Sequence, residues 1–210
     1  MNKIKVKICG ITNKKDAHDA LSAGADAIGF VFAKSPRQVS AAEVKAIVGS
    51  LGPWVFTVGV FVNESPAQIK KIAQACGLSA VQLHGSENPK SMRQFNFSRV
   101  IKAFRVDENF KSKDARQYKA DAYLFDTKVA GAYGGTGRSF DWKLFKKNMG
   151  MAFDRIPVII SGGLGVNNVE EAVSVLRPYG VDVSSGVEQK PGKKSFALMK
   201  EFVARAKGIK

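Results

Sequence analysis

The feature that most constrains this chain is a regular alternation, along its whole length, of short β-forming runs with amphipathic stretches. Eight runs rich in β-formers predict strands at residues 4–9, 27–32, 55–62, 80–84, 100–105, 122–126, 158–161 and 181–184. Strands that alternate with helix-length stretches are typical of repeated β/α units, whose strands lie parallel in one sheet. We therefore expect an α/β protein built on a parallel sheet.

The stretches between these runs have the apolar spacing of helices that pack one face on a sheet. They predict helices at residues 14–23, 41–50, 66–76, 89–95, 142–148, 168–176 and 194–206. Capping residues precede several of these helices, namely Asn13, Ser40, Ser65, Asp141 and Asn167. Residues 107–119 have a weaker pattern, so we expect mostly loop there and a fifth helix that is weak or absent.

Eight β/α units in 210 residues predict a single-domain (β/α)8 TIM barrel of minimal length that spans residues 1–210. Apolar stretches stay well short of the ~20 residues that a membrane helix needs. The N-terminus is interrupted by lysines and lacks the apolar core of a secretory signal. We expect a soluble, cytoplasmic protein with no membrane partner.

The formal net charge of +15 favours anionic partners, because it raises their local concentration. Nucleic acid is one such partner, but the lysines are spread along the chain and no basic block is interleaved with stacking aromatic residues. We therefore expect no nucleic-acid partner and assign the charge mainly to solubility and to long-range attraction of small anions.

Alternation along each strand separates two faces, because successive side chains of a β-strand point to opposite sides. The apolar faces are expected to meet the helices, and they carry Ile4, Val6 and Ile8 in the first strand and Val58, Val60 and Val62 in the third. The opposite faces of later strands carry polar residues, namely Gln82, His84, Asp126, Asp182 and Ser184. Strands buried on both sides read as continuous hydrophobic runs, so these polar faces favour a closed barrel with the polar residues inside.

Three chemically capable side chains end their strands: Cys9, His84 and Asp126. The carboxyl ends of all barrel strands lie at the same end of the barrel, and this fold has its active site there. Structural roles remain open, with Cys9 as a packed thiol and Asp126 as a turn cap. For His84 we favour a role in orienting a loop or hydrogen-bonding to backbone over proton transfer. Cys76 is interpreted as structural. The two cysteines have no C-x-x-C spacing, so we expect free thiols and no metal site.

Glycine-rich turns follow the last three predicted strands: GGTGRSFDW at 134–142, SGGLG at 161–165 and SSGVE at 184–188. Glycine lets backbone amides approach an anion, and this fold often binds phosphate with the loops after its seventh and eighth strands. The predicted phosphate-binding residues are Gly135, Gly137, Gly162, Gly163, Ser184, Ser185 and Gly186. A phosphate-bearing small molecule is therefore the expected ligand.

Taken in order, the segments KICGIT, GADAIGFVF, SPR, VGVFVN, VQLHG, FDT, GGTGRSFDW, SGGL and VDVSSGVE resemble phosphoribosylanthranilate isomerase across nearly the whole chain. The resemblance implies a step of tryptophan synthesis that needs no cofactor, the Amadori rearrangement of N-(5-phosphoribosyl)anthranilate to 1-(2-carboxyphenylamino)-1-deoxyribulose 5-phosphate. It implies Cys9 as general base and Asp126 as general acid, with Arg37 holding the anthranilate carboxylate. We place His84 and Asp182 among the substrate contacts.

The residue types suit this chemistry independently of the resemblance. An acid must protonate the furanose ring oxygen, and a base must then remove the C2 proton from the Schiff base. Asp126 serves as the acid only if it retains or receives a proton, and Cys9 serves as the base only as thiolate. Lys7, on the same strand face as Cys9, is predicted to tune the thiol pKa by favouring the thiolate.

Two other functions are open from the sequence. The aminoaldose isomerase of histidine synthesis performs a similar rearrangement on a two-phosphate substrate with a pair of aspartates, whereas the first strand here ends in Cys9. A basic anion-binding module without catalysis would bind nucleic acid with a steep salt dependence and show no isomerase turnover. If the chain is the enzyme, association with a neighbouring tryptophan-pathway enzyme is also open.

Overall fold

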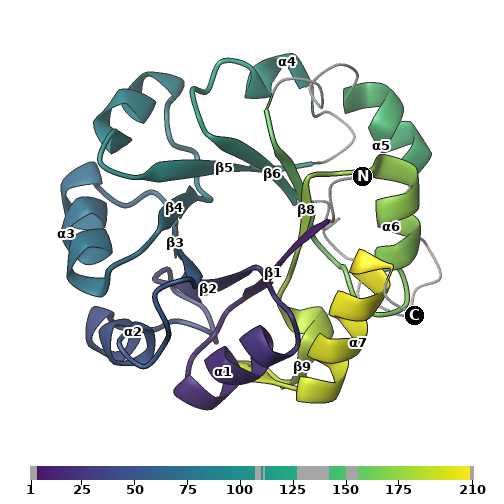
Figure 1. Cartoon of the computed structure of the whole chain (residues 1–210). Helices are drawn as coiled ribbons and strands as arrows, with labels where there is room; N and C mark the ends of the chain where they lie inside the picture. Colours follow the sequence, from purple (N-terminus) through teal and green to yellow (C-terminus); the bar gives the residue numbers. More distant parts are fainter. Residues whose placement is uncertain (1–3, 107–109, 111, 127–141, 150–155, 209–210) are drawn as a thin grey trace.

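The computed structural model describes residues 4–106, 110, 112–126, 142–149 and 156–208. Within these residues, eight parallel strands close into a barrel in chain order, with β8 (Gly180–Val183) paired to β1 (Lys5–Cys9) (Figure 1). The strands between them are β2 (Ala27–Val31), β3 (Phe56–Phe61), β4 (Ala80–Leu83), β5 (Arg99–Arg105), β6 (Ala122–Asp126) and β7 (Val158–Ser161). The predicted (β/α)8 barrel is confirmed, and every strand end lies within one residue of its predicted position.

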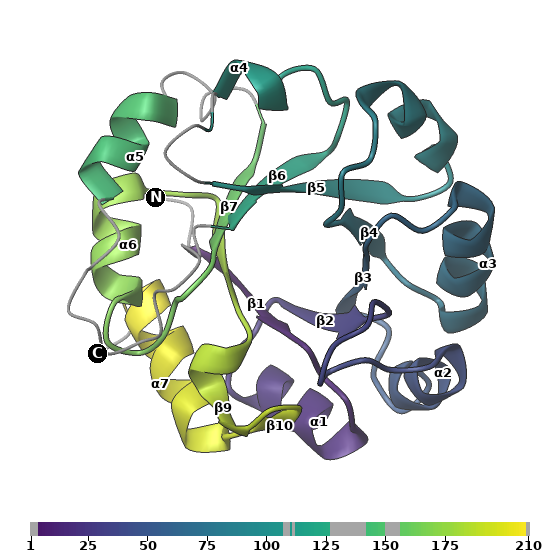
Figure 2. The same cartoon turned by 180° about the vertical axis from the view of Figure 1, so that it is seen from behind.

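Helices form an outer ring around the barrel, seen from its two sides in Figures 1 and 2. They are α1 (Lys14–Ser22), α2 (Ala41–Val48), α3 (Pro66–Cys76), α4 (Ser112–Ala115), α5 (Trp142–Met149), α6 (Val169–Leu176) and α7 (Phe196–Lys207). Across the described ranges, none of these helices is long and apolar enough to cross a membrane. The helices pack their apolar faces against the barrel strands.

Three segments refine the helix predictions. Residues 89–95 form a 3₁₀ helix, η1 (Pro89–Phe95), where an α-helix was predicted. After β5, the described residues contain the four-residue helix α4, as the weak sequence pattern predicted. The last helix begins later than predicted, because Lys193–Lys194 pairs as β10 with β9 (Glu188–Lys190) in a hairpin. A short 3₁₀ helix, η3 (Ser185–Val187), joins β8 to this hairpin.

Polar side chains cap the first turns of the helices as predicted. Asn13, Ser40 and Ser65 each accept a hydrogen bond from a backbone amide in the following turn. At α2 the bond is reciprocal, because the Glu43 carboxylate accepts from the backbone amide of Ser40. Asp141 lies outside the described residues. These caps satisfy amides that have no partner within their own helix.

The main hydrophobic core lies between the barrel and the helices. Val6 and Ile8 are fully buried there with Ala17 of α1 and Phe202 of α7, which confirms the predicted outward face of β1. The inner side of the same strand carries Lys7 and its alternating neighbours. Strand β1 therefore presents an apolar row to the helices and a polar row to the barrel interior.

The predicted orientation of β3 was wrong. Its valines were expected to face the helices, yet Val58 is fully buried in a second cluster inside the barrel, with Ile101 and Leu124. On the opposite face, Phe61 packs against Ile69 of α3. The valine face of β3 points inward, because the lower layers of a barrel interior are filled by side chains, and the outward face carries Thr57 and Gly59 beside Phe61. Hydrophobicity alone therefore does not distinguish inside from outside in this strand.

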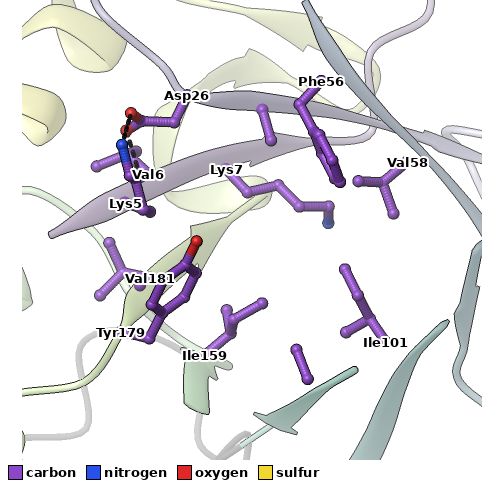
Figure 3. A pocket seen from close by; sticks show the side chains of 13 residues that line it. Lys5, Val6, Lys7, Asp26, Phe56, Val58, Ile101, Ile159, Tyr179 and Val181 are labelled. Atoms are coloured by element: carbon purple, nitrogen blue, oxygen red, sulfur yellow. Dashed lines mark hydrogen bonds and ion pairs between the residues drawn. The ribbon is translucent and has the colours of Figure 1, made fainter. Parts of the chain in front are cut away.

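At the amino ends of the strands, the barrel interior encloses a cavity of about 300 Å³. Phe56, Val58, Ile101 and Ile159 line it, and the hydrocarbon stem of Lys7 extends along its wall (Figure 3). Ion-paired Lys5 and Asp26 lie at one side of the cavity. This end of the barrel is thus mainly apolar, and the chemically capable residues lie at the other end.

Candidate active site

Cys9 ends β1 with its side chain inside the barrel, and the residue is only 7% exposed. Lys7 lies below it and forms a buried ion pair with Asp182 of β8, at 2.8 Å between Nζ and Oδ1. Gly29 of β2 leaves room for both side chains, because a Cβ at this position would lie 2.9 Å from Cys9 Sγ and 2.9 Å from Lys7 Cε. Ser161 of β7 donates to the second Asp182 oxygen at 3.2 Å. The structure therefore brings Cys9, Lys7 and Asp182 together, as their strand positions predicted.

Burial raises the pKa of the Cys9 thiol, because the buried site disfavours the thiolate. The positive charges of Lys7 and Lys194 act in the opposite direction, and the Asp182 carboxylate reinforces the rise. The Lys7 charge therefore favours the thiolate, as predicted, but Lys7 is ion-paired with Asp182. The effect of burial is larger than that of Lys7, so the pKa of Cys9 is raised overall. The site holds a thiol that ionises with difficulty and that becomes a strong base once ionised.

Arg37 lies in the loop after β2, and its guanidinium binds Glu188 in a two-bond fork. Nε donates to Oε1 at 2.7 Å, and one terminal nitrogen donates to Oε2 at 2.6 Å. Gly10 allows this approach, because it has φ +77° and its missing Cβ would lie 2.6 Å from Arg37 Cδ and 3.0 Å from Ser184 Oγ. The glycine after Cys9 thus brings Arg37 and the β8 loop against the end of β1.

Glu188 and Lys194 are the site residues that sequence reasoning missed. Lys194 Nζ donates to Glu188 Oε1 at 2.8 Å and to the backbone oxygen of Ser184 at 3.1 Å. Both residues lie in the β9–β10 hairpin, which the sequence marks with a Pro-Gly turn at residues 191–192. That turn signal was available, but it does not reveal that the hairpin lies beside Arg37.

Asp126 ends β6 and contacts His84, with 3.3 Å between Oδ2 and Nε2. The other ring nitrogen of His84 lies 3.2 Å from Gln82 Nε2. Gln82 is almost fully buried, and among the described residues its Oε1 has no hydrogen-bond partner. The three side chains form a polar chain inside the barrel. The contacts of the His84 side chain are with Gln82 and Asp126, whereas a role in orienting a loop or bonding to backbone was favoured for it and stays a prediction.

The predicted phosphate loops after β7 and β8 are packed against each other through backbone. Gly162 and Gly163 have φ of +89° and +66°, a conformation that side chains disfavour. A Cβ at Gly186 would lie 2.0 Å from the oxygen of Leu164, so only glycine fits there. Ser185 begins η3 beside this contact. The two loops therefore form one glycine-lined surface.

Asn168 holds the loop after β7 in shape. Its Oδ1 accepts from the Gly165 amide at 2.9 Å, and its Nδ2 donates to the Gly163 oxygen at 3.1 Å. It occupies the N-cap position of α6, where Asn167 had been predicted. The predicted N-cap was therefore wrong by one residue. The Asn168 side chain also does not cap the helix, since it bonds to the preceding loop. Gly135 and Gly137 lie outside the described residues.

The barrel and the polar residues at the carboxyl ends of its strands define the chain as a (β/α)8-barrel enzyme. Within the residues described, no group of three or more His, Cys, Asp or Glu side chains is arranged to hold a metal ion. The sequence profile of the N-(5'-phosphoribosyl)anthranilate isomerase family matches residues 6–205. The chain therefore belongs to the N-(5'-phosphoribosyl)anthranilate isomerase family.

Individual relatives agree over nearly the full chain. The N-(5'-phosphoribosyl)anthranilate isomerase of Geobacter sulfurreducens is 47% identical over 98% of this chain and 99% of its own. The crystal structure of phosphoribosyl anthranilate isomerase from Thermotoga maritima is 43% identical, with a TM-score of 0.86 over 98% of this chain and 100% of that chain. A further structure, 40% identical with a TM-score of 0.83 and covering 98% of this chain and 100% of that chain, is a complex with reduced 1-(o-carboxyphenylamino)-1-deoxyribulose 5-phosphate.

Proposed function

We propose that this chain converts N-(5-phosphoribosyl)anthranilate to 1-(2-carboxyphenylamino)-1-deoxyribulose 5-phosphate, with Cys9 as general base and Asp126 as general acid. The observation that carries the proposal is the position of these two residues. Each ends a barrel strand with its side chain on the interior side, in a chain that matches the isomerase family over residues 6–205. The complex of a relative with a reduced form of this product supports the same substrate class.

The rearrangement needs two proton transfers in sequence. Asp126 protonates the ring oxygen, the bond from that oxygen to C1 breaks, and the anilino nitrogen forms a Schiff base with C1. The Cys9 thiolate then removes the C2 proton, which gives an enolamine that tautomerises to the C2 ketone. The proton taken from C2 is balanced by the one gained at C1, and the proton released from the C2 hydroxyl balances the one given to the ring oxygen.

The contact between Asp126 and His84 supports the acid role. The amide nitrogen of Gln82 can only donate, so His84 Nδ1 accepts from it and Nε2 carries the proton that faces Asp126. A carboxyl group keeps an acceptor oxygen whether it is protonated or ionised, so Asp126 can accept from Nε2 in both states. The residue that holds Asp126 in place therefore accommodates the carboxyl group before and after it gives up its proton.

The raised pKa of the buried Cys9 thiol supports its role as the base. A proton on carbon is a weak acid, so its removal favours a base of high pKa, and burial raises the pKa of this thiol. Lys7 and Lys194 act against that rise, because their positive charges favour the thiolate. The site thus combines a basic thiolate with two cations that stabilise it once it forms.

An activity assay tests the proposed function directly. Freshly prepared phosphoribosylanthranilate should lose its anthranilate fluorescence when the protein is added, and inorganic phosphate should compete with it if the glycine loops bind the phosphate group. Folded protein that shows no turnover would overturn the proposal. The two-phosphate aminoaldose of histidine synthesis is the comparison substrate, and preferential turnover of it would favour that isomerase.

A further inference from the structure

The β9–β10 hairpin is tied firmly to the start of the chain. Thr12 Oγ1 donates to the Gly192 oxygen at 2.7 Å, and the Lys194 amide donates to Asp16 Oδ2 of α1 at 2.8 Å. These bonds join residues about 180 positions apart in sequence. The hairpin is therefore a fixed support beside the end of β1 and the loop that carries Arg37.

This support places one carboxylate between two cations. The Glu188 side chain is 4% exposed and accepts the Arg37 fork, while the fully buried ammonium of Lys194 bonds to the same carboxylate. Burial would raise the pKa of Glu188, but the hydrogen bonds from Arg37 and Lys194 outweigh it and lower the pKa below its ordinary value. Glu188 is therefore ionised and holds both cations.

The fork leaves one edge of the Arg37 guanidinium open. Nε and one terminal nitrogen point at Glu188, so two of the three remaining N–H bonds lie side by side on the edge formed by the two terminal nitrogens. That edge matches a second carboxylate in a two-bond geometry. The Arg37 side chain is 21% exposed, whereas its two partners are nearly or fully buried, so the accessible donors of the cluster belong to Arg37.

Charge balance gives Lys194 a separate role. Arg37 and Glu188 alone would be neutral as a pair, and a neutral pair attracts a substrate carboxylate weakly. With Lys194, the cluster carries one more positive than negative charge. Burial lowers the pKa of Lys194, and the adjoining Glu188 carboxylate offsets part of that effect.

We propose that Glu188 is a positioning residue that fixes Arg37 for the carboxylate of the substrate's aryl amine, and that Lys194 keeps this cluster attractive to an anion. The proposal rests on the proposed function and deepens it, because it assigns selection of a carboxylated aryl amine to residues that the substrate need not touch. Burying a charge is costly unless it is paired, so three charged groups gathered here point to a role that apolar residues would not fill.

Two substrates that differ only in the carboxylate test this proposal. Phosphoribosylanthranilate carries the carboxylate, and the corresponding phosphoribosylaniline lacks it. Glu188→Gln should raise KM for the first by about tenfold or more with kcat changed less than about threefold, and should leave KM for the second unchanged. Equal losses with both substrates would show a merely structural role, and an unchanged KM for the first would also overturn the proposal.

Lys194→Met keeps the length of the side chain and removes its charge. It should also raise KM selectively for the carboxylated substrate, because the cluster becomes neutral. Glu201→Gln is the matched control, since Glu201 pairs with Arg205 on the exposed face of α7, and both KM values should stay as in the unmodified enzyme.

Binding of anthranilate itself gives a reading that does not depend on turnover. Its Kd, measured by fluorescence, should rise by about tenfold in Glu188→Gln, whereas aniline should bind both proteins equally. An unchanged anthranilate Kd would overturn the positioning role even if the enzyme isomerised another substrate. Wild-type turnover tests the proposed function, and the ratio of variant to wild type tests Glu188.

Discussion

At the carboxyl ends of the strands the barrel carries ionisable side chains in contact with one another, including two ion pairs, whereas at the amino ends it contains a mainly apolar cavity of about 300 Å³. The same strands build both ends. Buried ion pairs are costly to desolvate and add little net stability, whereas buried apolar surface is the main stabilising contribution to folding. Substitutions at the two ends should therefore separate activity from stability.

The largest effect is expected from the two proposed catalysts. Cys9→Ala and Asp126→Asn should each lower kcat by at least ~100-fold while ligand affinity stays within about threefold, because each residue supplies a proton transfer and little binding. Single-turnover kinetics and ligand titration measure the two quantities. Cys76→Ala, which removes the other thiol, should remain active. Near-normal turnover in either variant would exclude that residue from the mechanism.

The next largest effect is expected from Arg37→Ala. It should raise KM by roughly 10- to 100-fold with a smaller change in kcat, since the carboxylate that Arg37 is proposed to bind is remote from the reacting carbons. Steady-state kinetics check this, with Arg205→Ala on the exposed face of α7 as the control arginine. If KM does not change, the carboxylate is bound elsewhere.

A comparison within β1 isolates the electrostatic difference between the two ends. Lys7→Met should move the ascending limb of kcat/KM to higher pH, because burial raises the Cys9 pKa and the Lys7 charge that opposes this rise is lost. Alkylation of Cys9 at neutral pH should slow in parallel. Lys5→Met, in the exposed pair at the opposite end, should shift neither.

Lys7→Met also leaves the Asp182 carboxylate unpaired, and this charge itself raises the thiol pKa. The double variant Lys7→Met with Asp182→Asn removes both charges. A smaller shift in the double variant than in Lys7→Met would assign the difference to Asp182. If folded Lys7→Met keeps the same ascending limb of the kcat/KM pH profile and the same rate of Cys9 alkylation, Lys7 does not affect the pKa of the thiol.

The smallest effect on activity is expected at the amino ends. Val58→Ala enlarges the cavity and should lower the free energy of unfolding by about 1–2 kcal/mol, while kcat changes by less than about twofold. Denaturant titration and kinetics measure the two. Ala122→Val, which fills part of the same cavity, should raise stability by about 0.5–1 kcal/mol. A fall in kcat as large as that in Cys9→Ala would contradict the separation of the two ends.

Local patterns were enough to predict the barrel, the strand ends and the carboxyl-end positions of Cys9, His84 and Asp126. Strand length, capping and the alternation of side chains are set by residues close in sequence. The same reasoning was wrong for β3, because the more apolar face of this strand fills the barrel interior and only closure of the barrel determines that Val58 points inward. It was also wrong for Asn167, where the side chain of Asn168 bonds to the preceding loop.

Local propensity and period were enough to predict the eight barrel strands, most of the helices and the reactive side chains at the strand ends, but not the β9–β10 hairpin. Which charges meet depends on the tertiary structure. Arg37 and Glu188 are 151 positions apart, and Lys7 and Asp182 are 175 apart, so no local pattern links them. Closure of β8 onto β1 and the hairpin after β8 bring these groups within hydrogen-bond distance. Pairing between distant charges depends on the three-dimensional path of the chain, and it is this pairing that sets the electrostatics around Cys9 and Arg37.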